Sequence, residues 1–218
     1  MAHRRPRDED WQVFALAAGP LPARVRVAGR FVRVLPVGRI AVIVGSPHEL
    51  PVEEALRDQH AIVLELARRF DPILPVRFGA RMTAARIADV VRPSAEVLAK
   101  ALAHVRGRQQ MTIRFVGPAA PAPVPAAGGA DYLAHRLAAQ TYPPAASPFR
   151  EAVSRFVVDE RTQPGRGTVR LTVFHLVDRN HVPAYIQAAK DASDLIDPWR
   201  ISLSGPWPPF AFAPELPR

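Results

Sequence analysis

The fold of this chain depends on the stretch MTIRFV, Met111–Val116. Apolar and polar residues alternate in it, so Met111, Ile113 and Phe115 share one face of an expected strand, opposite Thr112 and Arg114. The patterns that follow predict a helix, two strands, a helix and a last strand. With MTIRFV as the first strand, this is the order of a ferredoxin-like split βαβ unit, a sheet with helices on one face. The later elements are expected at residues 130–140 and 148–156 (helical), 157–162 and 168–177 (a hairpin), 183–196 (helix) and 199–204 (strand).

A boundary between two domains is expected at Gly107, just before this strand. Residues 117–129 are almost wholly proline, alanine and glycine, a composition typical of a connector that builds no core. A boundary inside this tract is the alternative, but it would remove the opening strand from the second domain. The sequence therefore predicts an N-terminal domain over residues 1–107 and a ferredoxin-like domain over residues 108–218.

The first half mixes strand and helix patterns, so the expected fold class is α+β. Val52, Leu56 and Val63 recur at helical spacing, which predicts a helix that starts near Pro51 and stops before Asp71-Pro72. Strands are expected at residues 11–17, 31–35, 39–44 and 73–78, and shorter helices at residues 83–91 and 94–105.

The composition excludes several classes of protein. The longest aliphatic run, Ile40–Val44, is far shorter than the roughly 18 residues of a membrane-spanning helix. Acidic residues at 8–10 follow the N-terminal arginines, so a secretory signal is not expected. The chain has no cysteine, which excludes disulfides and thiolate metal sites and fits a cytoplasmic location.

The net charge of +9 makes a basic nucleic-acid-binding module the main alternative function. Only Lys100 and Lys190 are lysines, and the arginines are spread along the chain without a basic tail or an aromatic-basic strip. The pattern favours an undirected positive surface over nucleic-acid binding.

No catalytic, cofactor-binding or metal-binding motif is present in the sequence. No two histidines stand three or four residues apart, and no phosphate-binding or dinucleotide-binding loop occurs. His60 is interpreted as a hydrogen-bonded, partly buried imidazole on the apolar face of its helix, rather than as a ligand or proton shuttle. An enzyme whose site assembles from distant residues stays an alternative, and it requires a cleft that joins His60, Arg77 or His175 to a carboxylate.

The segment LPVRFG, Leu74–Gly79, places an arginine among apolar neighbours. Arg77 is expected to be held by a carboxylate from a packed helix, with anion binding as the other interpretation. Phe78 shares the apolar face of the expected strand, and Gly79 allows a sharp turn.

The C-terminal stretch SGPWPPFAF, Ser204–Phe212, packs prolines and aromatic residues together. Its prolines hold the chain extended, and its aromatic side chains would leave a large apolar patch if exposed. A strap folded across its own domains is favoured over an exposed P-x-x-P ligand. This strap spans residues 204–212 and includes Gly205, Pro206, Trp207, Pro208, Pro209 and Phe210.

Several of these segments, taken in order, resemble the gas vesicle protein GvpF/GvpL family. SGPWPPFAF resembles its C-terminal signature, LPVRFG its LP-x-RFG segment, and His60 a histidine in the preceding helix. GADYLAHR, residues 129–136, resembles its G-x-x-YL-x-x-R stretch and adds Tyr132 and Arg136 to the candidate residues.

The resemblance implies a two-domain α+β protein whose second domain is a modified ferredoxin-like fold. It implies a role in assembling gas vesicles, with the small hydrophobic shell protein GvpA and other accessory gas vesicle proteins as partners. It implies no enzymatic activity, no cofactor, and no nucleic acid or membrane partner. The structural and interaction candidates are His60, Arg77, Phe78, Gly79, Tyr132, Arg136, Gly205, Pro206, Trp207, Pro208, Pro209 and Phe210.

Overall fold

The structure, a computed structural model, describes residues 10–47, 49–117 and 141–214. It divides into two compact units. The first comprises the chain up to Gly107 together with the C-terminal segment from Trp207, and the second runs from Arg108 to Pro206. The chain therefore leaves the N-terminal unit after Gly107 and returns to it at Trp207, within the strap. The sequence analysis instead expects the strap to belong to the domain over residues 108–218.

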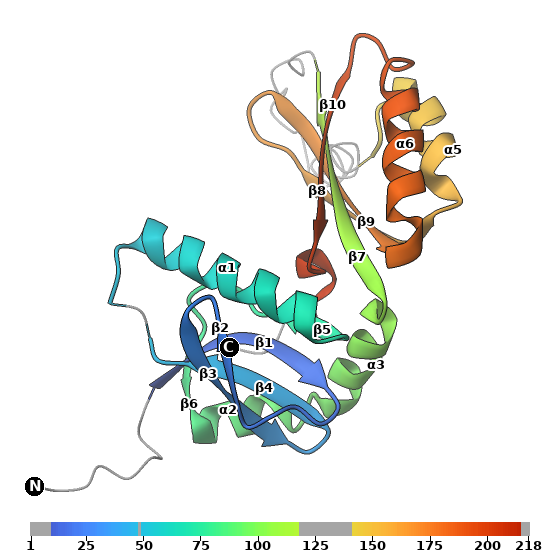
Figure 1. Ribbon diagram of the computed structural model, residues 1–218. Helices are drawn as coiled ribbons and strands as arrows, with labels where there is room; N and C mark the ends of the chain where they lie inside the picture. The colour runs from blue at the N-terminus through green and yellow to red at the C-terminus, as the bar shows by residue number, and fades with distance from the viewer. Residues whose placement is uncertain (1–9, 48, 118–140, 215–218) are drawn as a thin grey trace, which may run out of the picture. The chain divides into compact units, whose positions relative to one another are not determined.

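The N-terminal unit contains a six-stranded sheet in which β1 is central (Figure 1). The strands run in the order β2-β3-β4-β1-β5, with β6 also paired to β1. Strand β1 pairs antiparallel with β4, β5 and β6. The strands are β1 (Asp10–Ala18), β2 (Arg24–Val27), β3 (Arg30–Val37), β4 (Ile40–Gly45), β5 (Ile73–Pro75) and β6 (Arg81–Thr83).

Helices cover both faces of this sheet, because its central strands are apolar on both sides. Every residue of β4 is buried, as is expected of a strand packed between two layers. Helix α1 (Val52–Arg69) lies over one face, and α2 (Ala84–Val91) and α3 (Ala95–Val105) contribute to the other (Figure 1). On the α1 side, Phe14 and Ile43 pack with Ile62 and Leu66 in one apolar cluster.

The second unit has a four-stranded sheet in the order β10-β7-β9-β8. In chain order these are its fourth, first, third and second strands, with helices between them, so the unit is ferredoxin-like. Both β7–β9 and β8–β9 are antiparallel. Its described elements are β7 (Arg108–Val116), η1 (Pro144–Ala146), α5 (Ser147–Ser154), β8 (Val157–Pro164), β9 (Val169–Asp178), η2 (Arg179–His181), α6 (Val182–Ser193) and β10 (Arg200–Trp207).

The alternation of MTIRFV gives this unit its core, as the sequence predicts. Met111, Ile113 and Phe115 are buried in one cluster with Phe149 of α5 and Tyr185 of α6, whereas Arg114 is exposed. The α+β fold class with a ferredoxin-like second unit is confirmed. Residues 118–129 of the expected connector and the expected helix at 130–140 lie outside the described residues.

Some local expectations are wrong. The strand expected at residues 73–78 ends at Pro75, and the short strands β2 and β6 were not expected. The helix expected at residues 148–156 begins at Ser147 and ends at Ser154, and the hydroxyl of Ser147 donates to the carbonyl of Pro144. No helix in the described part of the chain is long and apolar enough to cross a membrane.

Candidate functional site

The candidate site is built on α1, whose two flanks differ in chemistry. The face toward the sheet buries Ala55, Gln59, Ile62, Val63 and Leu66. These residues recur at helical spacing, so burial of this face fixes which side chains lie on either flank.

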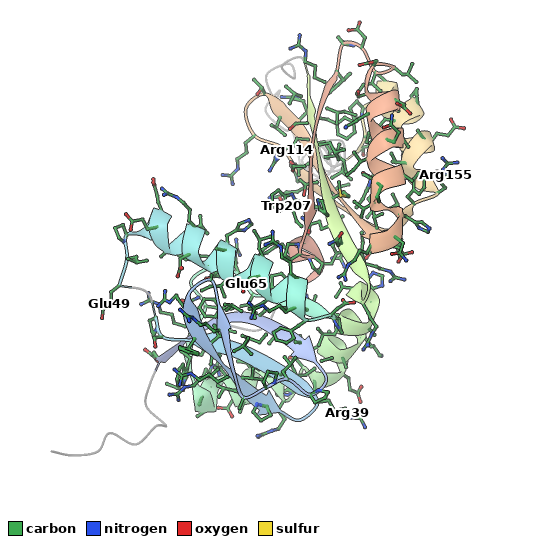
Figure 2. All side chains as sticks on the ribbon, viewed as in Figure 1. Arg39, Glu49, Glu65, Arg114, Arg155 and Trp207 are labelled. Atoms are coloured by element: carbon green, nitrogen blue, oxygen red, sulfur yellow. The ribbon has the colours of Figure 1, made fainter. Side chains whose placement is uncertain are left out.

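One flank of α1 is polar and is bonded to the β2–β3 hairpin. Arg30 Nη1 donates to Asp58 Oδ2 at 2.6 Å, and Arg69 Nη1 donates to the carbonyl of Arg26 at 2.7 Å. Glu65, labelled in Figure 2, accepts from the backbone amide of Ala28 and pairs with Arg69. These charge-assisted bonds fix the helix to the edge of the sheet.

The opposite flank is apolar and largely exposed. Val52, Leu56 and His60 follow one another at intervals of four residues, so they lie in one row along the helix. Val52 is 73% exposed and Leu56 50% exposed, and His60 is also exposed. We call this row the α1 stripe.

The C-terminal strap covers part of this row at His60. The ring centroid of Trp207, labelled in Figure 2, lies 5.7 Å from that of His60. The ring of Phe210 is stacked on the His60 ring, with 6.0 Å between the centroids and 14° between the planes. Such ring pairs are attractive beyond the area that they bury. The strap ends in a 3-10 turn, η3 (Phe210–Phe212), which contacts β5.

The strap is anchored by its prolines and its last aromatic residue. Pro208 and Pro209 are buried, and Phe212 is 4% exposed. Trp207 is half-buried and Phe210 is 37% exposed. Gly205 has φ of +123°, a conformation that side chains rarely adopt, and Pro206 is exposed. The aromatic stretch therefore lies against the chain's own N-terminal unit.

The interpretation of His60 as a partly buried residue of the apolar helix face is wrong. The buried face of α1 is centred on Gln59 and Ile62. His60 lies outside this face and is exposed, and its ring contacts aromatic rings of the strap. Spacing alone groups His60 with Leu56 and Val63, but only Val63 points into the core.

The segment after β5 is held by its backbone. The amide of Val76 donates to the carbonyl of Phe14, and its carbonyl accepts from Nε2 of the buried Gln59 at 3.2 Å. Gln59 also accepts from Gln12, another buried glutamine, at 3.0 Å. This buried amide pair could not be predicted from the sequence, because glutamines are usually exposed.

Arg77, Phe78 and Gly79 follow this anchored residue and form a turn. Arg77 is exposed, and among the described residues no carboxylate lies within salt-bridge distance of it, so the expected pairing with a helix carboxylate is wrong. Phe78 is half-buried, and Gly79 has φ of +83°, as its expected turn role requires. Tyr132 and Arg136 lie outside the described residues.

A second cluster of polar side chains lies in the ferredoxin-like unit around His175, which is 1% exposed. Nε2 of His175 lies 3.0 Å from Glu160 Oε2, and Nδ1 lies 2.8 Å from the hydroxyl of Tyr185. The hydroxyl of Tyr142 donates to the same carboxylate oxygen at 2.8 Å. The feature of the sequence that could have revealed this cluster is the alternation of residues on β9. It places His175 on the same face of the strand as the core residues Val173 and Val177.

This cluster is a closed hydrogen-bond network rather than an open site. The hydrogen bond from His175 is the main cause that holds the pKa of Glu160 below its usual value, and the bond from Tyr142 acts in the same direction. Burial raises the pKa of both Tyr142 and Tyr185. His175 thus meets a carboxylate, as a distributed active site would require, but the imidazole itself is 1% exposed, while Glu160 is 29% exposed.

Two cavities in the described part of the N-terminal unit have a different lining. One of about 240 Å³ and one of about 700 Å³ are bordered mainly by apolar and small residues with arginines, and neither joins a histidine to a carboxylate. In the described parts of the chain, no three histidine or carboxylate side chains are grouped to hold a metal ion.

The sequence model of the family described as "Gas vesicle synthesis protein GvpL/GvpF" matches residues 11–124 and 129–214. No curated protein matches the chain. Among the solved structures that resemble this chain, two are similar across almost their whole lengths.

The first of these is the gas vesicle protein GvpF from Anabaena sp. PCC7120, with a TM-score of 0.73 and 10% identity over 95% of this chain and 99% of that one. The second is GvpF from Microcystis aeruginosa, with a TM-score of 0.71 and 13% identity over 93% and 98% of the two chains. At these identities the likeness establishes the fold.

Proposed function

Because this chain belongs to the gas vesicle synthesis protein GvpL/GvpF family and so has a role in gas vesicle formation, we propose that it acts as an accessory or minor structural protein that binds the shell protein GvpA. In this role it nucleates the shell or keeps shell monomers from aggregating, and it acts by contact rather than by catalysis. The observation that carries the proposal is the family match, which extends over residues of both units.

The exposed apolar side chains of α1 support binding to a hydrophobic partner. Full burial of a valine or leucine side chain contributes about 1.5–3 kcal/mol. Val52 is 73% exposed and Leu56 50% exposed in the chain alone, so a partner that covers them would gain the remaining part of this energy.

The arrangement of the arginines supports this proposal over the nucleic-acid alternative. Arg24 lies 4.0 Å from the centre of the Phe31 ring, and Arg33 lies 5.0 Å from that of Trp11. Arg108 pairs with Asp178 at 3.1 Å. These guanidinium groups contact the protein's own rings and carboxylates, so they do not form one continuous face for phosphates.

Co-expression with the shell protein tests the proposal. A tagged chain is expected to retain GvpA through purification, and deletion of its gene is expected to reduce the number of floating vesicles. Retention of DNA or RNA at physiological salt is expected to be absent. Normal vesicles in the deletion strain together with no retained GvpA would overturn the proposal.

A further inference from the structure

One face of the β2–β3 hairpin gathers three arginines that have no acidic partner among the described residues. We propose that this face, the arginine patch of Arg24, Arg26, Phe31 and Arg33, binds an acidic, extended segment of a partner protein. The inference goes beyond the proposed binding of GvpA and does not depend on it.

The pairing of the two strands places the four side chains of the arginine patch on one face. Arg24 lies opposite Arg33, and Arg26 lies opposite Phe31, in the antiparallel register. Directly opposite residues share a face of a sheet, as do alternate residues of one strand. The residues between them belong to the apolar cluster on the α1 side and are Val25, Val27 and Val32. The arginine patch therefore faces away from α1.

The positive charges of the arginine patch are exposed and are not balanced by acidic side chains. In the part of the chain that the structure describes, no carboxylate lies within salt-bridge distance of Arg24, Arg26 or Arg33. Arg30, in the same hairpin, differs because it pairs with Asp58 at 2.6 Å. Like charges that lie directly opposite each other destabilise an antiparallel pair. A carboxylate bound between Arg24 and Arg33 would remove this repulsion and form charge-assisted hydrogen bonds.

Aromatic rings restrict the positions of these guanidinium groups. Arg24 lies 4.0 Å and Arg26 lies 5.9 Å from the centre of the Phe31 ring, and Arg33 lies 5.0 Å from that of Trp11. A guanidinium group over a ring keeps N–H donors that can bind a carboxylate. Because the ring already restricts the side chain, binding costs less conformational entropy than it does for an unrestricted arginine.

The spacing of the arginine patch fits an extended segment with an acidic residue at every second position. Arg24 and Arg26 are two residues apart on one strand, which corresponds to about 6.5–7 Å. Alternate side chains of an extended peptide have the same spacing, so two of its carboxylates can meet two arginines at once. Phe31 is 56% exposed and offers an apolar contact beside these charges.

The same geometry is less suited to nucleic acid. Arg24 already lies over the Phe31 ring, so that face of the ring cannot stack on a base. Three arginines are also few beside the roughly 6–10 phosphate contacts of a protein that binds a duplex. A peptide that carries carboxylates is therefore the favoured occupant of the arginine patch.

The experiment measures the binding of labelled peptides to the full-length chain by fluorescence anisotropy. The probe is a short peptide in which glutamate alternates with threonine. One control peptide has glutamine in place of glutamate, and another has the same glutamates in one adjacent run. Arg24→Gln with Arg33→Gln removes the opposed pair of charges. Arg39→Gln with Arg68→Gln is the matched control, because both arginines are exposed in the same unit and the net charge changes equally.

The unaltered chain and the control variant are expected to bind the alternating peptide equally, and neither should bind the glutamine peptide. The variant with glutamine at Arg24 and Arg33 is expected to bind at least fivefold more weakly, with a melting temperature close to that of the unaltered chain. Binding should weaken as the salt concentration rises.

A second variant keeps the test valid if the first one is unstable. Arg24→Lys with Arg33→Lys retains both charges, but lysine does not pair with a carboxylate through two parallel hydrogen bonds. This variant is expected to bind the alternating peptide with an affinity between those of the unaltered chain and the glutamine variant.

Several outcomes would overturn the assignment. No binding of the alternating peptide at low salt, or an equal loss in the control variant, would mean that the arginine patch has no role beyond net charge. Equal binding of the peptide with adjacent glutamates would exclude recognition of an extended segment. Tighter binding of a single-stranded oligonucleotide with the same number of charges, lost in the glutamine variant, would make the patch a nucleic-acid site. Retention of GvpA tests the proposed function separately.

Discussion

Glu160 keeps its negative charge because two neighbouring side chains bond to it. Its pKa is lowered mainly by the hydrogen bond with His175, and Tyr142 adds to this. A carboxyl group whose pKa is lower in the folded state stabilises the fold above its ordinary value of 4.5, and this contribution is lost as the pH falls through the lowered pKa.

Replacement of Glu160 is therefore expected to remove part of the acid sensitivity of the fold. In Glu160→Gln the free energy of unfolding should be lower than in the unaltered chain at pH 7, by about 1–3 kcal/mol, because a charge-assisted network is broken. The difference should shrink as the pH falls below 4.5. Urea unfolding from pH 7 to pH 3 measures it. The exposed Glu151→Gln is the control, and parallel curves for Glu160→Gln and the unaltered chain would contradict the assignment.

Gln59 is expected to be important for stability although glutamine is a surface residue in most helices. Gln59→Ala leaves the amide of buried Gln12 and the carbonyl of Val76 without this partner, at a cost of about 2–4 kcal/mol. Chemical unfolding measures the loss. Gln187→Ala, at an exposed glutamine of α6, should change the free energy by no more than about 0.5 kcal/mol. Equal effects of the two changes would contradict a structural role for the amide pair.

Some residue positions could be predicted from the sequence and others could not. Alternation places Met111, Ile113 and Phe115 correctly, because every second residue of a strand faces one side. His60 was misplaced because helical spacing defines a row of side chains but not where burial stops. Arg77 was misplaced because the strand that would have oriented it ends at Pro75.

At the scale of elements, the strap is a short segment whose aromatic residues are buried to different degrees. Phe212 is nearly fully buried, Trp207 is half-buried and Phe210 is 37% exposed. The loss of stability on truncation should follow this order, because the cost depends on the apolar contact that is removed.

The alanine variants of the three strap residues are expected to rank accordingly. Phe212→Ala should cost about 3–5 kcal/mol, Trp207→Ala about 1–3 kcal/mol and Phe210→Ala about 1 kcal/mol or less. Urea unfolding of each full-length variant gives the values. An unchanged stability of Trp207→Ala together with lost GvpA retention would mean that the strap is a docking ligand and not a structural anchor.

The sequence predicts the long elements well and the short ones poorly. The periodicity of α1 and of β7 extends over several repeats, which gives a clear pattern. Strand β2 has the sequence RVRV and β6 has three residues, so neither shows enough apolar positions to be recognised. They form because β3 and β1 offer them pairing partners, which is a tertiary effect.

At the scale of the whole molecule, the N-terminal unit is discontinuous in sequence. Its last part is the segment from Trp207 onward, which includes most of the strap and follows the ferredoxin-like unit in the chain. The sequence predicts two consecutive domains because the order of strand and helix patterns after Gly107 is that of one ferredoxin-like unit, but these patterns do not show where a distant aromatic segment packs.

A fragment of residues 1–107 is therefore expected to be incomplete. Addition of a synthetic peptide of residues 205–218 should raise its melting temperature as the peptide concentration rises, since binding to the folded state stabilises it. A peptide of scrambled order is the control. A fragment whose melting temperature is unaffected by the native peptide would show that the strap contributes nothing to this unit.

The return of the strap to α1 has a consequence for how the protein is made. A ribosome releases His60 before the strap, so a nascent chain carries His60 without its aromatic neighbours until residues 207–210 have emerged. Only a chain elongated past Phe210 can place both Trp207 and Phe210 against the helix. A chain that stops before Trp207 therefore leaves this apolar surface of α1 more exposed to solvent.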